Sequence, residues 1–322
     1  MTSLLDVRDL VVVYDTPRGR VVALDGVSLD LEAGETLGIV GESGSGKSTL
    51  GLAIGQLLPW NARRLSGDLS VLDLSVFGGD DERLRRLRRD VLGFVFQNPM
   101  TALDPTMRIG RQLARAIGPR ATRDSVRALL SRVGLAGAGR IEQSFPHELS
   151  GGMAQRAAIG MAIARNPRLI VADEPTASLD AWLRDQILEL LISMCSATGA
   201  SLVLLSHDLH VVSRYCRHVA VMYGGRIVEY AQRETLFDRQ AHPYTRALLE
   251  SAPGAEGPDG RLRPIQGLPP VITESSRGCA FAPRCGWMKD LCNDVRPEMR
   301  HTRDRSVLCH RAEEVLACRS GA

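Results

Sequence analysis

The chain has 322 residues, with 40 Lys and Arg against 37 Asp and Glu and a formal net charge of +3. This length allows one large domain or two smaller ones. The small net charge is not gathered into one long basic block, which argues against a nucleic-acid binder.

The first residues lack a basic region followed by an apolar core, so we expect no secretory signal. No stretch reaches the roughly 18 apolar residues of a membrane span. A cytosolic protein is therefore expected, in which spaced cysteines indicate metal binding or catalysis before disulfides. Only Lys47 and Lys289 are lysines. A lysine in this arginine-rich chain indicates a place where a compact ammonium is needed.

Three apolar runs predict buried strands: ETLGIV at 35–40, RLIVAD at 168–173 and SLVLLS at 201–206. Runs that are apolar on both faces and separated by helices are typical of a mainly parallel sheet covered on both sides. The basic stretch at 83–89 has apolar residues at helical spacing, which predicts a solvated helix face. Residues 108–150 show helical periodicity, and we expect a helical insertion in an α/β core.

The segment GESGSGKS at 41–48 follows the first run and precedes a helical pattern. It fits the phosphate-binding pattern G-x-x-x-x-G-K-[ST], in which backbone N–H groups and a helix N-terminus hold phosphate oxygens. Lys47 would reach the β- and γ-phosphates, and the Ser48 hydroxyl would ligate Mg²⁺. The run LIVADEP then places Asp173 near the Mg²⁺ shell and Glu174 where it can deprotonate the attacking water.

A second anion site is predicted where LSGGMAQR at 149–156 begins an alanine-rich helix. With this segment the chain resembles the nucleotide-binding domain of ABC transporters over about residues 4–250. The resemblance implies a P-loop NTPase (RecA-like) core with a mainly parallel sheet, an antiparallel β subdomain and a helical subdomain at about 99–155. We expect residues 251–277, rich in Pro, Gly and Ser, to be a linker, and 278–322 to be a cysteine-bearing extension.

The resemblance also assigns roles to single residues. Tyr14 matches the aromatic that stacks on adenine, and Gln97 matches the glutamine that senses the γ-phosphate and Mg²⁺ and lies where a membrane partner docks. Ser178-Leu179-Asp180 matches a loop that couples two nucleotide sites, and His207 matches the switch histidine at the γ-phosphate. We expect Glu174, His207 and Gln97 to be catalytic, and Ser48, Gln97 and Asp173 to hold Mg²⁺. The nucleotide-binding positions are expected to be Tyr14, Gly41, Ser43, Gly44, Gly46, Lys47, Ser48, Thr49, Gln97, Ser150, Gly151, Gly152, Asp173 and Asp180.

The chain ends in four spaced cysteines, Cys279, Cys285, Cys292 and Cys309. Structural zinc sites usually present C-x2-4-C pairs, and these wider spacings suit a [4Fe–4S] cluster better, although the spacing leaves Zn²⁺ open. The segments AHPYTRALLESAP, IQGLPP and GCAFAPRC resemble the C-terminal extension of oligopeptide/dipeptide importer ATPases, which implies the cluster. Cys195, Cys216 and Cys318 are expected to be unliganded, the first two in the core. The histidines other than His207 are expected at the surface or in hydrogen bonds.

The function implied is an ATP-hydrolysing subunit, on the cytoplasmic face of the membrane, of a peptide importer. Its partners would be two transmembrane permeases, a second homologous ATPase subunit or a second copy, and an extracytoplasmic binding protein, with no nucleic acid. One alternative is the same role with nickel or a metal chelate as cargo. A second is a soluble ABC ATPase of translation or DNA repair, and a third is a non-hydrolysing regulatory subunit, against which Glu174 and His207 argue.

Overall fold

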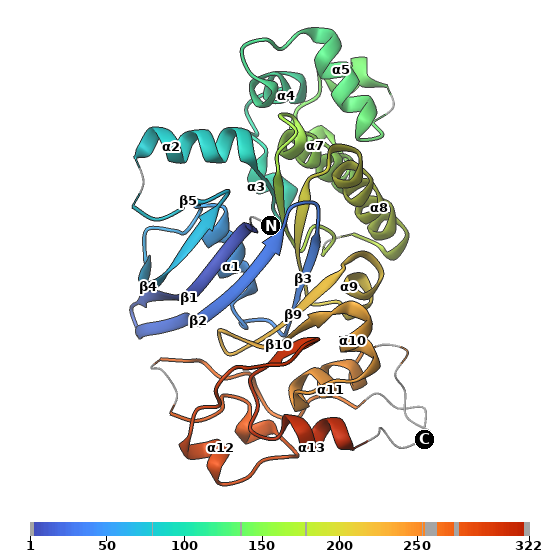
Figure 1. Ribbon diagram of the computed structural model, residues 1–322. Coiled ribbons are helices and arrows are strands. Elements are labelled where there is room, and N and C mark those ends of the chain that lie inside the picture. Colours follow the sequence, from blue (N-terminus) through green and yellow to red (C-terminus); the bar gives the residue numbers. More distant parts are fainter. Residues whose placement is uncertain are drawn as a thin grey trace. The chain divides into compact units, whose positions relative to one another are not determined.

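The computed structural model describes residues 3–78, 80–135, 137–177, 179–252, 254, 263–273 and 277–318. The chain divides into two compact units (Figure 1). The first unit consists of Met1–Leu4, Glu32–Glu35 and Gly78–Leu204. The second consists of Leu5–Leu31, Thr36–Phe77 and Leu205–Ala322.

The first unit combines helices with strands in the order β8-β7-β6. Strand β6 runs parallel to β7, with Leu92 opposite Leu169 and Val95 opposite Ala172. Its elements are α2 (Asp81–Arg86), a π-helical turn (Leu87–Val91), β6 (Leu92–Val95), α3 (Pro99–Ala102), α4 (Ile109–Ile117), α5 (Arg123–Arg132), α6 (Ala138–Ile141), a 3₁₀ turn (Pro146–Glu148), α7 (Gly151–Ile163), β7 (Leu169–Asp173), α8 (Ala181–Thr198) and β8 (Ser201–Ser206), whose last two residues belong to the second unit.

Side chains at the helix ends explain where several of these helices begin. Thr122 and Ser125 form a reciprocal capping box at the start of α5, which satisfies backbone N–H groups that lack partners within the helix. Asp180 accepts a hydrogen bond from the Leu183 N–H at 2.9 Å and begins α8, and Gly199 ends it in the left-handed conformation. Helices α4, α5 and α6 confirm the helical pattern read at 108–150.

The second unit holds a four-stranded sheet, β2-β1-β4-β5, and strands in the order β11-β12-β10-β9-β3. Strand β3 is parallel to β9, which pairs with β10 antiparallel. Its elements are β1 (Ser3–Thr16), β2 (Gly19–Glu32), β3 (Thr36–Val40), α1 (Lys47–Ile54), β4 (Ala62–Val71), β5 (Leu74–Ser75), α9 (Leu209–Tyr215), β9 (His218–Tyr223), β10 (Arg226–Gln232), α10 (Arg233–Asp238), α11 (Pro243–Glu250), a 3₁₀ turn (Ala282–Arg284), α12 (Leu291–Asp294), β11 (Arg300–His301), β12 (Arg305–Val307) and α13 (Ala312–Ala317).

The three strands read from apolar runs are confirmed as β3, β7 and β8, each within one residue of its expected start. Every residue of β7 and β8 is buried, as expected for strands covered on both faces. The basic stretch at 83–89 is helical and exposed apart from Leu87 and the half-buried Leu84, which confirms a solvated face. Of the expected linker, residues 253, 255–262 and 274–276 lie outside the described residues.

The cysteine-bearing extension joins the second unit as a strand. Figure 1 shows β12 beside β10, and the two are antiparallel, with Glu229 opposite Val307. The side chain of Glu229 is fully buried. Its carboxylate accepts from the backbone N–H groups of Ala241 at 2.8 Å and His242 at 3.0 Å and pairs with the Arg305 guanidinium at 3.3 Å. This buried carboxylate therefore links β10, β12 and the start of α11.

We predict that Arg305→Met lowers the free energy of unfolding by about 3–5 kcal/mol, because it leaves the Glu229 carboxylate buried without its cation. Arg300→Met is the control: Arg300 lies on the neighbouring β11, and its pair with Glu313, 3.8 Å long, is exposed, so its loss should cost under about 1 kcal/mol. Urea unfolding of both variants measures the difference. Equal midpoints would contradict the role given to Glu229.

Candidate functional site

The predicted phosphate-binding loop lies between β3 and α1 in the second unit. Lys47 is buried, and its Nζ donates to the carbonyl oxygens of Gly41 at 2.7 Å and Glu42 at 3.1 Å. The lysine side chain therefore bridges the two ends of its own loop and stabilises the loop conformation. Gly46 precedes α1 with φ 105°, and a Cβ there would lie 2.5 Å from the Ala23 carbonyl oxygen, so no other residue fits.

The residues at the start of α1 are arranged to receive an anion. Ser48 is exposed in the first turn of the helix, where backbone N–H groups have no partner within the helix. Its hydroxyl is the hard oxygen ligand that Mg²⁺ prefers. Tyr14 lies beside the same helix, because its hydroxyl is 3.2 Å from Thr49 Oγ1. The structure thus brings the residues expected at the base and at the phosphates to one end of α1.

In the first unit, Asp173 is the last residue of β7 and Glu174 follows it. The side chain of Asp173 is buried and that of Glu174 is half-buried. Gln97 donates to Glu174 Oε2 at 3.4 Å, so two of the three residues expected to be catalytic are brought into contact. Glu174 has φ 42°, a left-handed conformation that costs a non-glycine residue about 1–2 kcal/mol. Such strain is found where a side chain must be aimed.

The segment Ser150–Gly152 begins α7. Ser150 is the N-cap, and its hydroxyl accepts from the Met153 N–H at 3.3 Å. A Cβ on Gly152 would lie 2.5 Å from Leu183 Cδ2 of α8, so a larger residue there would displace the end of that leucine side chain. Gly151 meets no such crowding, its nearest neighbour being Leu179 Cδ2 at 3.8 Å. The two glycines therefore have different physical reasons, a distinction that the sequence did not reveal.

His207 directly follows β8 in the second unit and is exposed. Ser178, expected in the coupling loop, lies outside the described residues, whereas Asp180 caps α8. Cys195 and Cys216 are buried in the core as predicted, and burial raises the pKa of both thiols to about 12.

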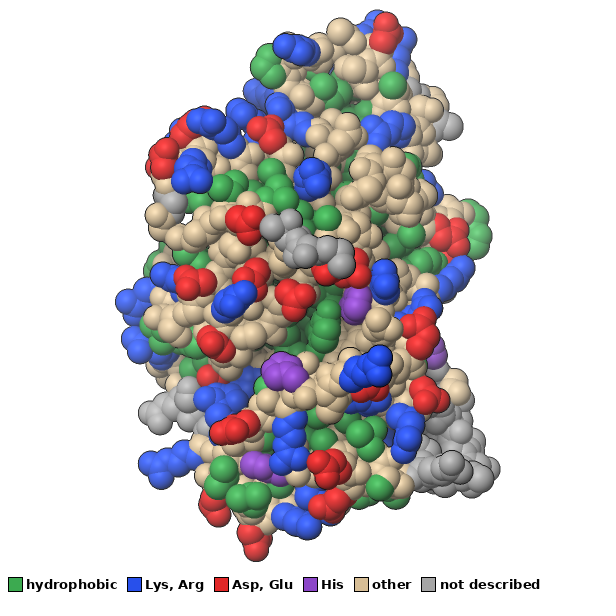
Figure 2. Space-filling view, in the orientation of Figure 1, with side chains coloured by type: hydrophobic (Ala, Val, Ile, Leu, Met, Phe, Trp, Pro, Cys, Tyr) green, Lys and Arg blue, Asp and Glu red, His purple; other side chains and the backbone are tan. Residues whose placement is uncertain are grey.

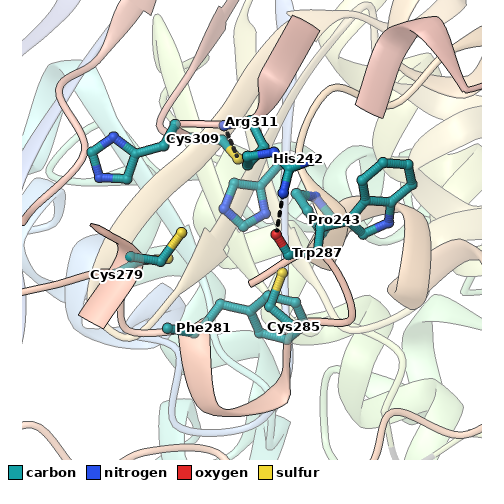
Figure 3. Close-up of a pocket in the computed structure, with 11 residues that line it drawn as sticks. His242, Pro243, Cys279, Phe281, Cys285, Trp287, Cys309 and Arg311 are labelled. Carbon is teal, nitrogen blue, oxygen red and sulfur yellow. Dashed lines mark hydrogen bonds between the residues drawn. The ribbon is translucent and has the colours of Figure 1, made fainter. Parts of the chain in front are cut away.

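The four tail cysteines line one cavity of the second unit, with aromatic and apolar walls (Figure 3). The backbone N–H of Cys279 donates to the Cys292 carbonyl at 2.8 Å. This approach needs Gly278, where a Cβ would lie 2.2 Å from the Asn293 carbonyl oxygen. The backbone therefore brings cysteines that are widely spaced in the sequence to the same cavity.

The cavity has a volume of about 10 Å³, which is room for about one water molecule. Burial raises the pKa of Cys279, of Cys285 to about 11 and of Cys309 to about 12, so these thiols are protonated at neutral pH. Among the described residues, no three His, Cys, Asp or Glu side chains are arranged to hold a metal ion. A bound metal centre would require the sulfur atoms to lose protons and to move.

Two polar groups of the cavity suit a sulfur-rich ligand. The backbone N–H of Arg311 points at Cys309 Sγ, 3.3 Å away, and hydrogen bonds to sulfur are a feature of iron–sulfur sites. Figure 3 shows the ring of His242 among the cysteines. His242 is fully buried, and burial lowers its pKa to about 3.

The hydrogen bonds of His242 determine which nitrogen carries its proton. Nδ1 accepts from the Tyr244 N–H at 3.0 Å, so the proton of the neutral ring is on Nε2. Within the described part of the chain this buried Nε2–H has no acceptor, which costs about 1–3 kcal/mol. A thiolate or sulfide in the cavity would accept it. The donor chemistry thus fits a thiolate-held centre.

Sequence reasoning missed several residues around the phosphate-binding loop. Glu42 was read only as a variable position of the pattern, yet its N–H donates to the Tyr244 hydroxyl at 2.9 Å and its carboxylate pairs with Arg284 at 2.7 Å. His242 was expected at the surface or in hydrogen bonds, and the hydrogen-bonded alternative is confirmed, although the sequence did not reveal that the ring is buried. The sequence signals that could have pointed to these two residues were the short segments around them, AHPYT for His242 and PRC for Arg284.

The surface has the mixed charge expected from composition. Figure 2 shows Lys and Arg side chains interspersed with Asp and Glu over the face in view. Within the described residues, no helix combines the length and apolar character needed to cross a membrane.

Comparison with known proteins agrees with these features. The ABC transporter family matches residues 24–177, and the family described as oligopeptide/dipeptide transporter, C-terminal region, matches residues 228–292. The second match includes three of the tail cysteines and ends before Cys309. Among solved structures, a dimeric ATP-binding cassette in a post-hydrolysis state with ADP and phosphate has a TM-score of 0.63 and 29% identity, and covers 71% of this chain and 98% of its own.

The dipeptide transport ATP-binding protein DppD of Bacillus subtilis is 40% identical over 92% of this chain and 91% of its own length. The oligopeptide transport ATP-binding protein OppD of Mycobacterium tuberculosis is 40% identical over 98% of this chain. The chain spans about half, 53%, of that mycobacterial relative. The resemblance predicted from the motifs is thus confirmed: the chain belongs to the ABC transporter family, among its oligopeptide and dipeptide transport ATP-binding proteins.

Proposed function

We propose that the chain hydrolyses ATP to energise the import of peptides by an ABC transporter. The observation that carries this proposal is the loop between β3 and α1, where a buried lysine closes a glycine-rich turn at a helix N-terminus. In this arginine-rich chain such a lysine is a compact cation placed for phosphate. The near-full-length similarity to DppD of Bacillus subtilis supports peptides as the cargo.

Each proposed residue would supply one part of the chemistry. Lys47 would neutralise the β- and γ-phosphates, Tyr14 would stack on the base, and His207 would stabilise the γ-phosphate. Asp173 would bind Mg²⁺, which supplies positive charge at the phosphates. The bound ion would also have Ser48 and Gln97 as ligands.

Glu174 would accept a proton from a water molecule whose oxygen bonds to the γ-phosphorus. The bond between that phosphorus and the bridging oxygen breaks, and ADP and phosphate leave. The contact of Gln97 with Glu174 supports a shared role for these two side chains at the water. Ser150–Gly152 would complete the nucleotide site of a second ATPase subunit.

The proposed partners are two transmembrane permeases, a second homologous ATPase subunit or a second copy of this chain, and an extracytoplasmic binding protein. The chain would lie on the cytoplasmic face of the membrane, where ATP is available. ATP binding would favour a closed pair of ATPase subunits and hydrolysis would release it, so the work done is a shift of population.

The cysteine cavity would hold a [4Fe–4S] cluster bound by Cys279, Cys285, Cys292 and Cys309, with Zn²⁺ as the alternative. The proposal is supported by the four thiols on one cavity and by the unpaired donor on His242 Nε2. A cluster would supply a rigid link among four segments of the tail. The cysteine centre would take no part in phosphoryl transfer, so its role would be structural or regulatory.

We predict that this chain, isolated gently from detergent-solubilised membranes, is accompanied by two multi-span permeases and a second ATPase subunit. Mass spectrometry of the affinity-purified complex identifies them. Ribosomal or DNA-repair proteins in place of permeases would overturn the transport function and leave the ATPase assignment intact.

We predict that Glu174→Gln lowers ATP turnover by about 10²–10⁴-fold, because the water loses its general base, while ATP binding is kept. The complex should then remain closed with ATP bound. Glu189→Gln, an exposed glutamate on α8, is the matched control and should turn over ATP like the parent. Phosphate release measures turnover, and parent-like turnover in Glu174→Gln would remove it from the mechanism.

We predict that anaerobically purified protein contains iron and acid-labile sulfide, and that Cys285→Ser loses most of both. Cys318→Ser, which changes an exposed cysteine outside the cavity, should retain them. Elemental analysis and the visible absorption of the cluster provide the measurement. Zinc without iron or sulfide in the parent protein would replace the cluster by the zinc alternative.

A further inference from the structure

Arg284 of the tail makes a two-pronged ion pair with the phosphate-binding loop. Its Nη1 lies 2.7 Å from Glu42 Oε2, and its Nη2 lies 3.0 Å from Glu42 Oε1. The Arg284 side chain is only 5% exposed, against 25% for Glu42. A buried bidentate pair of this kind fixes direction as well as distance, which a single surface ion pair does not.

The guanidinium is itself held in place from several sides. Its Nε donates to the Gln266 carbonyl at 2.8 Å, and its Nη1 also donates to the Tyr223 hydroxyl at 3.2 Å. The ring of Tyr223 packs against those of Tyr244 and Phe281. Arg284 is thus pre-positioned, and little further ordering is needed to bind Glu42.

Glu42 is the residue of the loop on which these contacts converge. Its carbonyl oxygen accepts from Lys47 Nζ, its N–H donates to Tyr244, and its carboxylate meets Arg284. The carboxylate belongs to a loop that binds a polyanion, so its negative charge opposes phosphate unless a cation neutralises it. Arg284 neutralises that charge through its two-pronged contact with the carboxylate.

The same arginine directly precedes Cys285, which lines the cysteine cavity. Arg284 ends the 3₁₀ turn Ala282–Arg284, and Cys285 follows it with its N–H bonded to the Ala282 carbonyl at 3.2 Å. Phe281 and Ala282 line the cavity together with Cys285. A shift of the Cys285 backbone that accompanies binding of a metal centre would therefore move the turn that carries the guanidinium.

We propose that Arg284 is a positioning residue of the phosphate-binding loop and that, through it, the occupancy of the cysteine cavity sets the affinity for nucleotide. The second half of this inference rests on the metal centre proposed above, whereas the first half depends only on the ion pair with Glu42.

The first half is tested by titrating ADP with Mg²⁺ into purified variants by calorimetry, since ADP is not hydrolysed during the titration. Arg284→Gln should weaken ADP binding about tenfold, because an uncompensated carboxylate remains in the loop. The double variant Arg284→Gln with Glu42→Gln should recover to within about threefold of the parent, since the repelling charge is gone. In the assembled transporter, Arg284→Gln should raise KM for ATP and leave kcat unchanged.

Arg296→Gln is the matched control. Arg296 also reaches from the tail to a carboxylate, that of Asp25 on β2, which keeps Arg226 at 2.5 Å when Arg296 is removed. Its ADP affinity should stay within about twofold of the parent. Parent-like binding in Arg284→Gln, or a double variant as weak as Arg284→Gln, would overturn the positioning role.

The second half is tested on anaerobically purified protein before and after removal of its metal by chelation under oxidation. In the parent, removal should weaken ADP binding about fivefold, and in Arg284→Gln the two states should bind equally. Equal binding in both states of the parent would overturn the coupling. Protein that holds neither iron nor zinc would overturn both the coupling and the proposed centre, and the ion-pair variants would still decide the first half.

Discussion

Three tail arginines reach back to carboxylates of the preceding chain, and the arrangement of the second unit depends on these pairs. Arg284 meets Glu42, Arg296 meets Asp25, and Arg305 meets Glu229. Each carboxylate is buried or half-buried, so leaving one without a cation costs far more than an exposed pair would gain. The tail is therefore fastened by charge at three separate places, and its departure would leave Glu42 and Glu229 without their cations, whereas Asp25 would keep Arg226.

The pair at Glu229 also prepares the cysteine cavity. Its carboxylate binds the N–H groups that precede α11, which holds His242 with one ring nitrogen against Tyr244 and the other in the cavity. The tail strand β12, which carries the Arg305 partner of Glu229, ends two residues before Cys309. The position of Cys309, the position of the histidine and the attachment of β12 thus share one buried carboxylate, which explains why this polar group lies in the core.

Local patterns in the chain were enough to locate the phosphate-binding loop, the strands β3, β7 and β8, and the start of α7. Each depends on residues within about ten positions, because glycine, lysine and a helix N-terminus act on their immediate backbone. The same reading missed Glu42, Arg284 and His242. Glu42 and Arg284 are 242 residues apart, and His242 shares a cavity with cysteines from a later part of the chain. No spacing rule reports such contacts. Gly152 was assigned to an anion, and the sequence did not show that it lies against the Leu183 side chain of α8.

The sequence by itself determined the family, the α/β class, the strand–loop–helix that binds phosphate and the identity of the four tail thiols, because these features are encoded in contiguous residues with specific backbone needs. Only the tertiary structure decided that the thiols share one cavity with a buried histidine, and that the arginine beside them neutralises a carboxylate of the phosphate-binding loop. Those relations depend on burial, which raises the cost of every unpaired charge and donor. The burial of these polar groups arises from segments far apart in the chain and cannot be read from any one of them.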